Sequence, residues 1–169
     1  MKQNDKVLAI DPGTRDMGVA FIDGGKLIYH GVKVIRQKRS PHEKLKAGRE
    51  IILRLIRDYR PTTLVVEKTF FARNRNTSLL NVFADEIVAI GKSKGLKVKS
   101  FAPSTMKKAI CGNGHASKEE VASVVVAKYP ELKVYMTQDR KWKERFHQNM
   151  FDAVALAMMD RNANLKRAG

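Results

Sequence analysis

Three acidic side chains stand directly beside stretches of core-type sequence, where an unpaired charge is costly. Asp11 follows the letters VLAI, Glu67 follows LVV, and Asp152 lies between MF and AVAL. Each acid also has a plain structural explanation on its own, as a turn residue, a strand exit or a polar helix position. Together they predict a shared site. Three converging carboxylates repel one another unless a cation is present, and ligands that are all oxygen favour Mg²⁺ or Mn²⁺ over zinc.

The balance of charge indicates what such a site would act on. The chain has 169 residues, with 33 Lys and Arg against 17 Asp and Glu, a formal net charge of +16. An excess of this size attracts polyanions, and nucleic acid is the polyanion that we expect. A basic surface that only keeps the protein in solution is the alternative. Metal ions held in a basic protein indicate phosphodiester hydrolysis, in which two ions activate water and stabilise the leaving oxygen.

Five strands are predicted to position these acids. Apolar runs and turn residues place the strands at residues 7–10, 17–22, 27–35, 62–66 and 98–101. Asp11 and Glu67 then stand at the C-terminal ends of the first and fourth strands, the edge where sites form in open α/β sheets. If these two strands are neighbours, their carboxylates converge.

Helices account for most of the remaining chain. Ser40 with Glu43, and Ser117 with Glu120, form the pattern of a capping box at a helix start. The spacing of apolar residues predicts helices over 41–60, 76–92, 103–110 and 117–128, and a final one containing 150–159. The segment 129–145 is predicted to be irregular and basic.

The order of these elements predicts a single α/β domain over residues 1–169. The first three strands are joined by hairpins and are expected to be antiparallel, whereas the later strands are joined through helices and are expected to be parallel. The prediction is a five-stranded mixed sheet with helices on both faces.

The composition also bears on where the protein works. The longest apolar run, residues 153–159, is far shorter than the roughly 20 residues that span a bilayer. The first residues lack the apolar core of a secretory signal. The single cysteine, Cys111, excludes an internal disulfide and a cysteine-based zinc site. A cytoplasmic location is the expectation.

Four longer motifs contain the three acids and their surroundings. They are LAIDPGTRDMGVAF at 8–21, LVVEKTFFARN at 64–74, MKKAICGNGHASKEEV at 106–121 and FDAVALAM at 151–158. In order and spacing they resemble the motifs of RuvC-type Holliday junction resolvases, over about residues 6–160. The resemblance implies a ribonuclease H-like fold and a homodimer that cuts four-way DNA junctions symmetrically with Mg²⁺, during recombination and repair.

The resemblance implies a role for each matching residue. Asp11, Glu67 and Asp152 match the catalytic metal ligands, which implies two Mg²⁺ ions per site, with Mn²⁺ as a substitute. The fourth ligand of the family, an Asp or His three residues before the last acid, is Asn149 here. Its amide oxygen can bind a hard cation but brings no charge, which predicts a weaker metal site or an altered activity. His147 could replace it only in a locally irregular helix.

Further matches fall on residues that would meet DNA. Phe70 matches the aromatic that stacks on bases near the junction centre, and Arg73 and Arg75 follow where they would meet phosphates. Lys107 and Lys118 match family lysines beside the scissile phosphate, where an ammonium group stabilises developing negative charge.

The resemblance also implies partners. The helix at 76–92 matches the dimer helix of the family, and its apolar residues cover more than one face; a wholly buried core helix is the alternative. A branch-migration helicase is a further partner that the family suggests. The segment 129–145, with Trp142 among basic residues, fits a DNA-contacting insertion and a mobile basic loop equally well.

The leading hypothesis is therefore a metal-dependent, structure-selective DNA endonuclease that resolves four-way junctions. A ribonuclease H-like nuclease acting on RNA precursors, as YqgF-type proteins do, is the second hypothesis. A non-catalytic junction-binding protein that has lost a metal ligand at Asn149 is the third.

Overall fold

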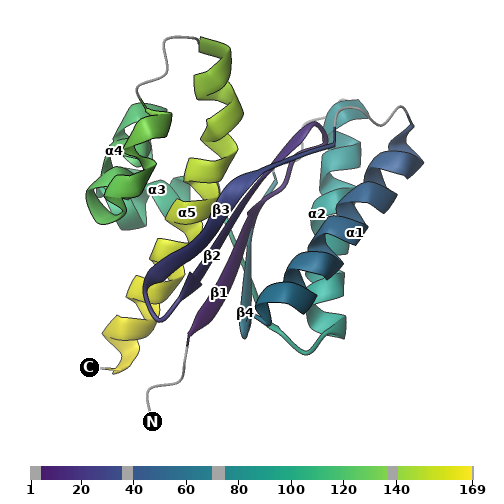
Figure 1. The fold of residues 1–169 in the computed structure, drawn as a ribbon, viewed down its shortest axis with the longest axis horizontal. Coiled ribbons are helices and arrows are strands. Elements are labelled where there is room, and N and C mark those ends of the chain that lie inside the picture. Colours follow the sequence, from purple (N-terminus) through teal and green to yellow (C-terminus); the bar gives the residue numbers. More distant parts are fainter. Residues whose placement is uncertain (1–4, 36–39, 70–74, 137–140, 169) are drawn as a thin grey trace.

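The computed structural model describes residues 5–35, 40–69, 75–136 and 141–168. Its centre is a five-stranded sheet with the strand order β3-β2-β1-β4-β5 (Figure 1). The strands are β1 (Lys6–Asp11), β2 (Asp16–Asp23), β3 (Lys26–Val34), β4 (Thr63–Glu67) and β5 (Lys97–Phe101). The helices are α1 (Pro41–Tyr59), α2 (Arg75–Ser93), α3 (Pro103–Cys111), α4 (Lys118–Lys128), the 3₁₀ helix η1 (Pro130–Tyr135) and α5 (Lys141–Ala168). Within the described ranges, no helix is long and apolar enough to cross a membrane.

The antiparallel and parallel halves of the sheet meet at β1. This strand pairs antiparallel with β2 and parallel with β4. The remaining pairs are β2 with β3, which is antiparallel, and β4 with β5, which is parallel. The hairpin-linked strands are thus antiparallel and the helix-linked strands parallel, so the predicted mixed sheet is confirmed.

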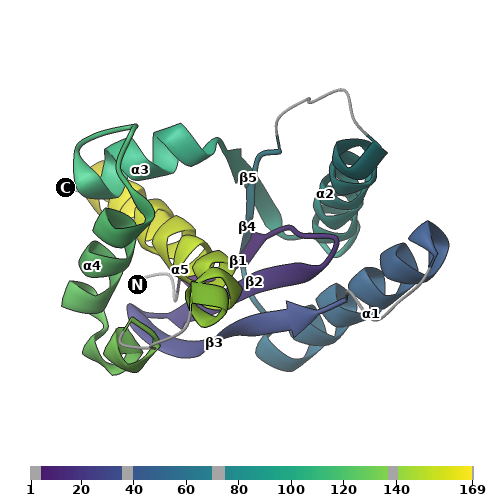
Figure 2. The same ribbon diagram turned by 90° about the horizontal axis from the view of Figure 1, so that it is seen from above.

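Alternate residues of β1 face two separate cores, as the period of two in a strand requires. Leu8 and Ile10 belong to the core that the sheet forms with α1 and α2. Val7 and Ala9 belong to the core on the opposite face, beneath α5. Figure 2 shows α1 and α2 on one side of the sheet and α3, α4 and α5 on the other. Helices on both faces were predicted, and the structure confirms them.

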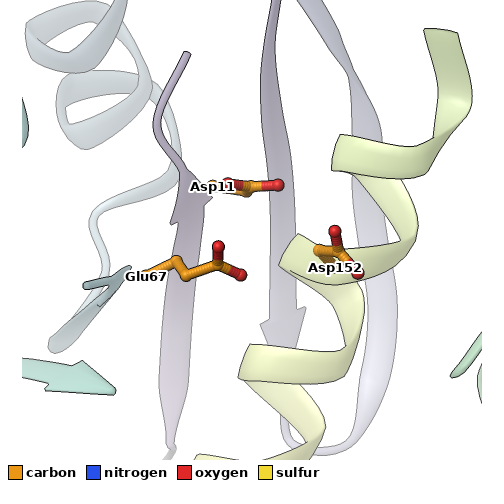
Figure 3. A group of neighbouring side chains, drawn as sticks. All are labelled: Asp11, Glu67 and Asp152. Carbon is orange, nitrogen blue, oxygen red and sulfur yellow. The ribbon is translucent and has the colours of Figure 1, made fainter. Parts of the chain in front are cut away.

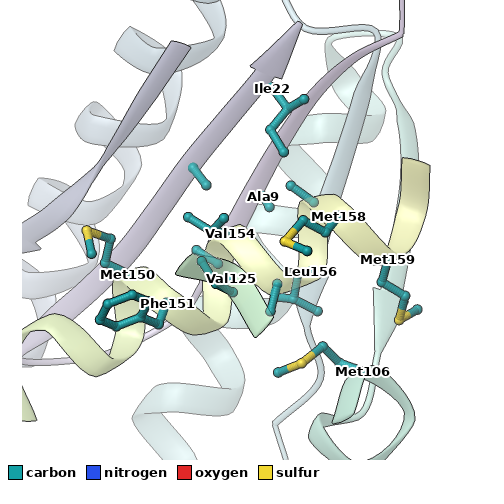
Figure 4. Packing of buried hydrophobic residues seen from close by; sticks show 14 of the residues in the cluster. Ala9, Ile22, Met106, Val125, Met150, Phe151, Val154, Leu156, Met158 and Met159 are labelled. Atoms are coloured by element: carbon teal, nitrogen blue, oxygen red, sulfur yellow. The ribbon is translucent and has the colours of Figure 1, made fainter. Parts of the chain in front are cut away.

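The core beneath α5 is built around the middle of that helix. Residues 153–157 have no exposed surface, and the helix lies against β2 and β1. Met106 of α3 and Val125 of α4 belong to the same buried cluster (Figure 4). A helix that is apolar on all sides is buried on all sides, so α5 is held in one position between the sheet and the other two helices.

Both predicted capping boxes are formed. At the start of α1, the Glu43 amide donates to Ser40 Oγ at 3.1 Å, and the Ser40 amide donates to Glu43 Oε2 at 3.4 Å. Ser117 and Glu120 repeat this exchange at the start of α4. The end of α1 is also where the sequence places it, because Arg60 adopts the left-handed conformation with φ 48° and ends the helix.

The prediction for residues 129–145 was wrong in part. Pro130–Tyr135 forms the 3₁₀ helix η1, in which Leu132 is fully buried, and α5 already begins at Lys141. The final helix also extends well beyond 150–159, to Ala168. Its outer turns carry mostly polar residues and have no apolar stripe that periodicity can detect. They continue a buried helix, and each added residue then costs little because the nucleus already exists.

Candidate active site

Three carboxylates from three separate elements meet on the α5 side of the sheet. Asp11 is the last residue of β1, Glu67 the last of β4, and Asp152 lies on α5. Each offers an oxygen, and these oxygens all lie within 4.8 Å of one another. Figure 3 shows the three side chains pointing into a common space between the two strands and the helix. The structure therefore brings together the three acids that the sequence singles out.

Strand register and side-chain alternation explain why the first two acids converge. Ile10 of β1 pairs with Val66 of β4, so the next residues, Asp11 and Glu67, end neighbouring parallel strands at the same edge. Ile10 and Val66 both face the α1–α2 core. The residues that follow them must face the opposite side, where α5 lies.

Burial and mutual repulsion dominate the electrostatics of this cluster. Burial raises the pKa of Asp11 well above its usual range, and the charges of Glu67 and Asp152 raise it further. Burial and the charge of Asp152 raise the pKa of Glu67 to about 8. The pKa of Asp152 is also raised, chiefly by burial. A divalent cation with oxygen ligands would offset this repulsion. The donor set thus fits Mg²⁺ or Mn²⁺.

The two lysines matched by the family motifs belong to the same electrostatic environment. Lys107 lies half-buried on α3, and its charge lowers the pKa of both Glu67 and Asp152. Lys118 is the first residue of α4, is exposed, and lowers the pKa of Asp152. A helix N-terminus presents free N–H groups and favours anions. An acidic centre beside two ammonium groups and a helix N-terminus can hold a metal and a phosphate together.

Asn149 lies one turn before Asp152 on α5, but its side chain has a clear protein partner. Its Nδ2 donates a hydrogen bond to the backbone carbonyl oxygen of Asp16 at 2.8 Å. The prediction that Asn149 is a fourth metal ligand is not tested by this contact, because the bond occupies the nitrogen and not the oxygen of the amide.

Two residues that support the site were not singled out from the sequence. Gln148 donates from Nε2 to Asp152 Oδ1 at 3.1 Å; its position four residues before the acid could have indicated this. Gly18 is the cross-strand partner of Asp11, and a Cβ there would lie 1.8 Å from the carbonyl oxygen of Asn149. A glycine inside an apolar strand indicates such a close approach.

The structure does not describe the side chains of the remaining residues that were predicted to contact DNA. Phe70 and Arg73 lie outside the described residues. Arg75 is the first residue of α2, but its side chain also lies outside what is described. Their proposed contacts with bases and phosphates remain predictions.

The helix expected to form a dimer has one apolar face in the core and apolar surface outside it. Phe83 and Ile87 of α2 are buried, at 3% and 0% exposure, whereas Val82 is 52% exposed. The wholly buried helix that the sequence also allowed is therefore excluded for this single chain.

Comparison with known proteins shows which family the chain resembles. The family model described as "Crossover junction endodeoxyribonuclease RuvC" matches residues 7–160. The protein of that name from Geobacter sulfurreducens is 34% identical over 125 residues, which cover 71% of this chain and 76% of the relative. The one from Hydrogenovibrio crunogenus is 30% identical over 129 residues, which cover 74% of this chain and 75% of the relative.

A solved structure agrees with the sequence comparison. Thermus thermophilus RuvC in complex with a Holliday junction substrate superposes with a TM-score of 0.71 at 25% identity, covering 91% of each chain. Over this length, the chain therefore has the same fold as the Thermus thermophilus protein.

Proposed function

The chain belongs to the RuvC family of crossover junction endodeoxyribonucleases, and from this we propose that it resolves four-way DNA junctions through Asp11, Glu67 and Asp152. The convergence of these carboxylates within 4.8 Å is the observation that carries the proposal. The substrate is proposed from the relatives, which bear the name of junction endonucleases, and from the solved relative that holds a Holliday junction.

The three carboxylates are proposed to hold Mg²⁺, two ions per site, with Mn²⁺ as a substitute. When bound, such ions supply an activated water and stabilise the leaving oxygen of a phosphodiester. Asp11 is the most buried of the three ligands, at 7% exposure, and therefore forms the floor of the site. Glu67 and Asp152 are half-buried, so they lie nearer to solvent than Asp11 does.

Lys107 and Lys118 are proposed to act on the phosphate. Both charges reach the carboxylate cluster, as their effects on the pKa of Asp152 indicate. A phosphate beside that cluster therefore lies near two ammonium groups, which offset the negative charge that develops during hydrolysis. The gap between the two helices that carry these lysines is short, from Cys111 to Lys118, so their spacing is constrained.

The family membership supports four further proposals. Two copies of the chain associate through α2, because a two-fold axis supplies the two sites that paired cuts require. Phe70, Arg73 and Arg75 contact the junction. A branch-migration helicase as partner and a cytoplasmic location complete the proposal.

The test is cleavage of a synthetic four-way junction with each strand end-labelled in turn. Linear duplex, a flap and a structured RNA serve as competing substrates, in Mg²⁺, Mn²⁺ or EDTA. We expect paired symmetrical cuts in the junction alone, and none in EDTA. Cuts in RNA or flaps would keep the metal site but contradict the substrate, and tight junction binding without cleavage would contradict the activity.

Substitution of each acid tests its role. Asp11→Asn, Glu67→Gln and Asp152→Asn should each reduce the cleavage rate by about 10²–10³-fold or more, because each removes a charged ligand at the reacting centre. Junction binding, measured by gel shift in Ca²⁺ or EDTA, should remain. Asp58→Asn and Glu50→Gln on the exposed face of α1 are the matched controls and should cleave normally. An acid whose substitution leaves cleavage intact has no part in the mechanism.

A further inference from the structure

The side chain of Asn149 joins α5 to the first residue of β2, where the turn that follows Asp11 ends. Its Nδ2 donates to the carbonyl oxygen of Asp16 at 2.8 Å. Asp16 opens β2, and only the short turn from Pro12 to Arg15 separates it from Asp11. One hydrogen bond therefore joins α5, which carries Asp152, to the start of β2, just after the turn that follows Asp11.

The backbone is closely packed at the same point. A Cβ at Gly18 would lie 1.8 Å from the carbonyl oxygen of Asn149 and 2.9 Å from the amide nitrogen of Met150. A Cβ at Gly13 would lie 1.9 Å from the Asp16 carbonyl oxygen and 3.6 Å from Asn149 Nδ2. The strand thus packs against the backbone of Asn149, and the turn lies beside its side-chain amide.

The partner of Asn149 determines which side chains can serve at this position. A carbonyl oxygen needs a donor, and the asparagine amide supplies one. An ionised aspartate only accepts hydrogen bonds, so it would face the Asp16 carbonyl without a proton to share. It would also add a fourth negative charge to a cluster of three. Asparagine is suited to hold the turn, whereas an acid is suited to hold a metal.

We propose that Asn149 is a positioning residue, whose amide fixes α5 against the β1–β2 turn so that Asp152 lies beside Asp11 before any metal binds. It is then not the fourth ligand that an acid at this position would be. The inference rests on the proposed metal site at the three carboxylates, and it makes that site a preformed one with three charged ligands.

The experiment compares Asn149→Ala and Asn149→Asp with the wild-type protein by two measurements. The first is the melting temperature of the metal-free protein in EDTA, and the second is the affinity for Mn²⁺ by calorimetry. Both variants should lower the metal-free melting temperature by about 2–4 °C. Both should also weaken Mn²⁺ binding by about 10-fold or more, as the loss of a group that orients ligands does. Asn162→Asp, an exposed position on the same helix, should change neither quantity.

The aspartate variant separates a positioning residue from a metal ligand. If Asn149 were a ligand, Asn149→Asp would bind Mn²⁺ more tightly than the wild type at an unchanged metal-free melting temperature, which would overturn the proposal. A lower melting temperature with unchanged Mn²⁺ affinity in both variants would also overturn it, because the bond would then be structural only. If Asn149→Asp does not fold, Asn149→Ala decides by the same two readings. Failure of the wild type to bind Mn²⁺ would instead reject the proposed metal site, and the melting temperatures would still test the bond.

Discussion

Protons and cations compete for the same oxygens of Asp11, Glu67 and Asp152. Folding places these acids close together and away from water, which raises the pKa of each. The metal-free protein therefore carries protons in this cluster at a pH where ordinary carboxylates are ionised. A cation that binds there must displace them, so metal binding should release protons near neutral pH.

Stability of the metal-free protein should fall as the pH rises from about 5 to about 8. Folding raises the pKa of Glu67 from 4.5 to about 8, so the folded state binds this proton more tightly than the unfolded chain does. The resulting stability is complete below the unfolded value and is lost as the pH rises through the folded one. Urea unfolding in EDTA across this range measures it. Glu67→Gln should remove part of the slope, and equal slopes for the two proteins would contradict the expectation.

The sequence predicted which carboxylates meet, but not what holds them. Asp11 and Glu67 stand at strand ends, and strand order alone brings them to one edge. The bond from Gln148 to Asp152 could have been predicted from helical spacing. The bond from Asn149 to the Asp16 carbonyl could not, because it depends on how closely α5 approaches β2, which is decided by packing over the whole face.

At the scale of elements, the critical contact is the crossing of α5 over β2. Gly18→Ala should destabilise the protein by about 1–3 kcal/mol, because an added methyl in a filled contact forces the backbone to move. The φ angle of Gly18 is not positive, so alanine is compatible with that angle and the effect reports on packing. Because α5 carries Asp152, cleavage should slow as well.

Urea unfolding and junction cleavage measure the two effects of Gly18→Ala. Gly114→Ala is the matched control, since its Cβ would approach no atom closer than 3.3 Å, and it should cost clearly less. A Gly18→Ala protein as stable and as active as the wild type would show that α5 does not rest on β2 as closely as the structure has it.

Most elements could be predicted because their ends are encoded locally. The capping boxes at Ser40 and Ser117 mark helix starts, and alternation marks the strands. The length of α5 could not be predicted in this way. Its middle is apolar on all sides and its outer turns are largely polar. The pattern of apolar residues therefore predicts only the buried turns of the helix. Tertiary packing of that middle supports the rest.

At the scale of the whole molecule, the proposed dimer through the exposed part of α2 can be tested. Val82→Asp should weaken a dimer by at least about 10-fold, because it buries a charge in an apolar interface. It should barely affect folding, since Val82 is already 52% exposed in the single chain. Sedimentation at several protein concentrations measures the change.

A second exposed valine provides the control for the dimer. Val134, 58% exposed on η1, lies on a different element, and Val134→Asp should leave the assembly intact. A wild-type protein that sediments as a monomer, or a Val82→Asp variant that remains dimeric, would contradict an interface through α2.

The order of the acids along the chain has a consequence for its synthesis. Asp11 and Glu67 lie on strands made early, whereas Asp152 lies on α5, which is made after all the other elements of the described structure. A chain still emerging from the ribosome presents two acids and much of its basic surface, but lacks the helix that completes the site. Under the proposed mechanism, such a nascent chain cannot cut DNA. The nuclease then becomes active only after α5 has been translated.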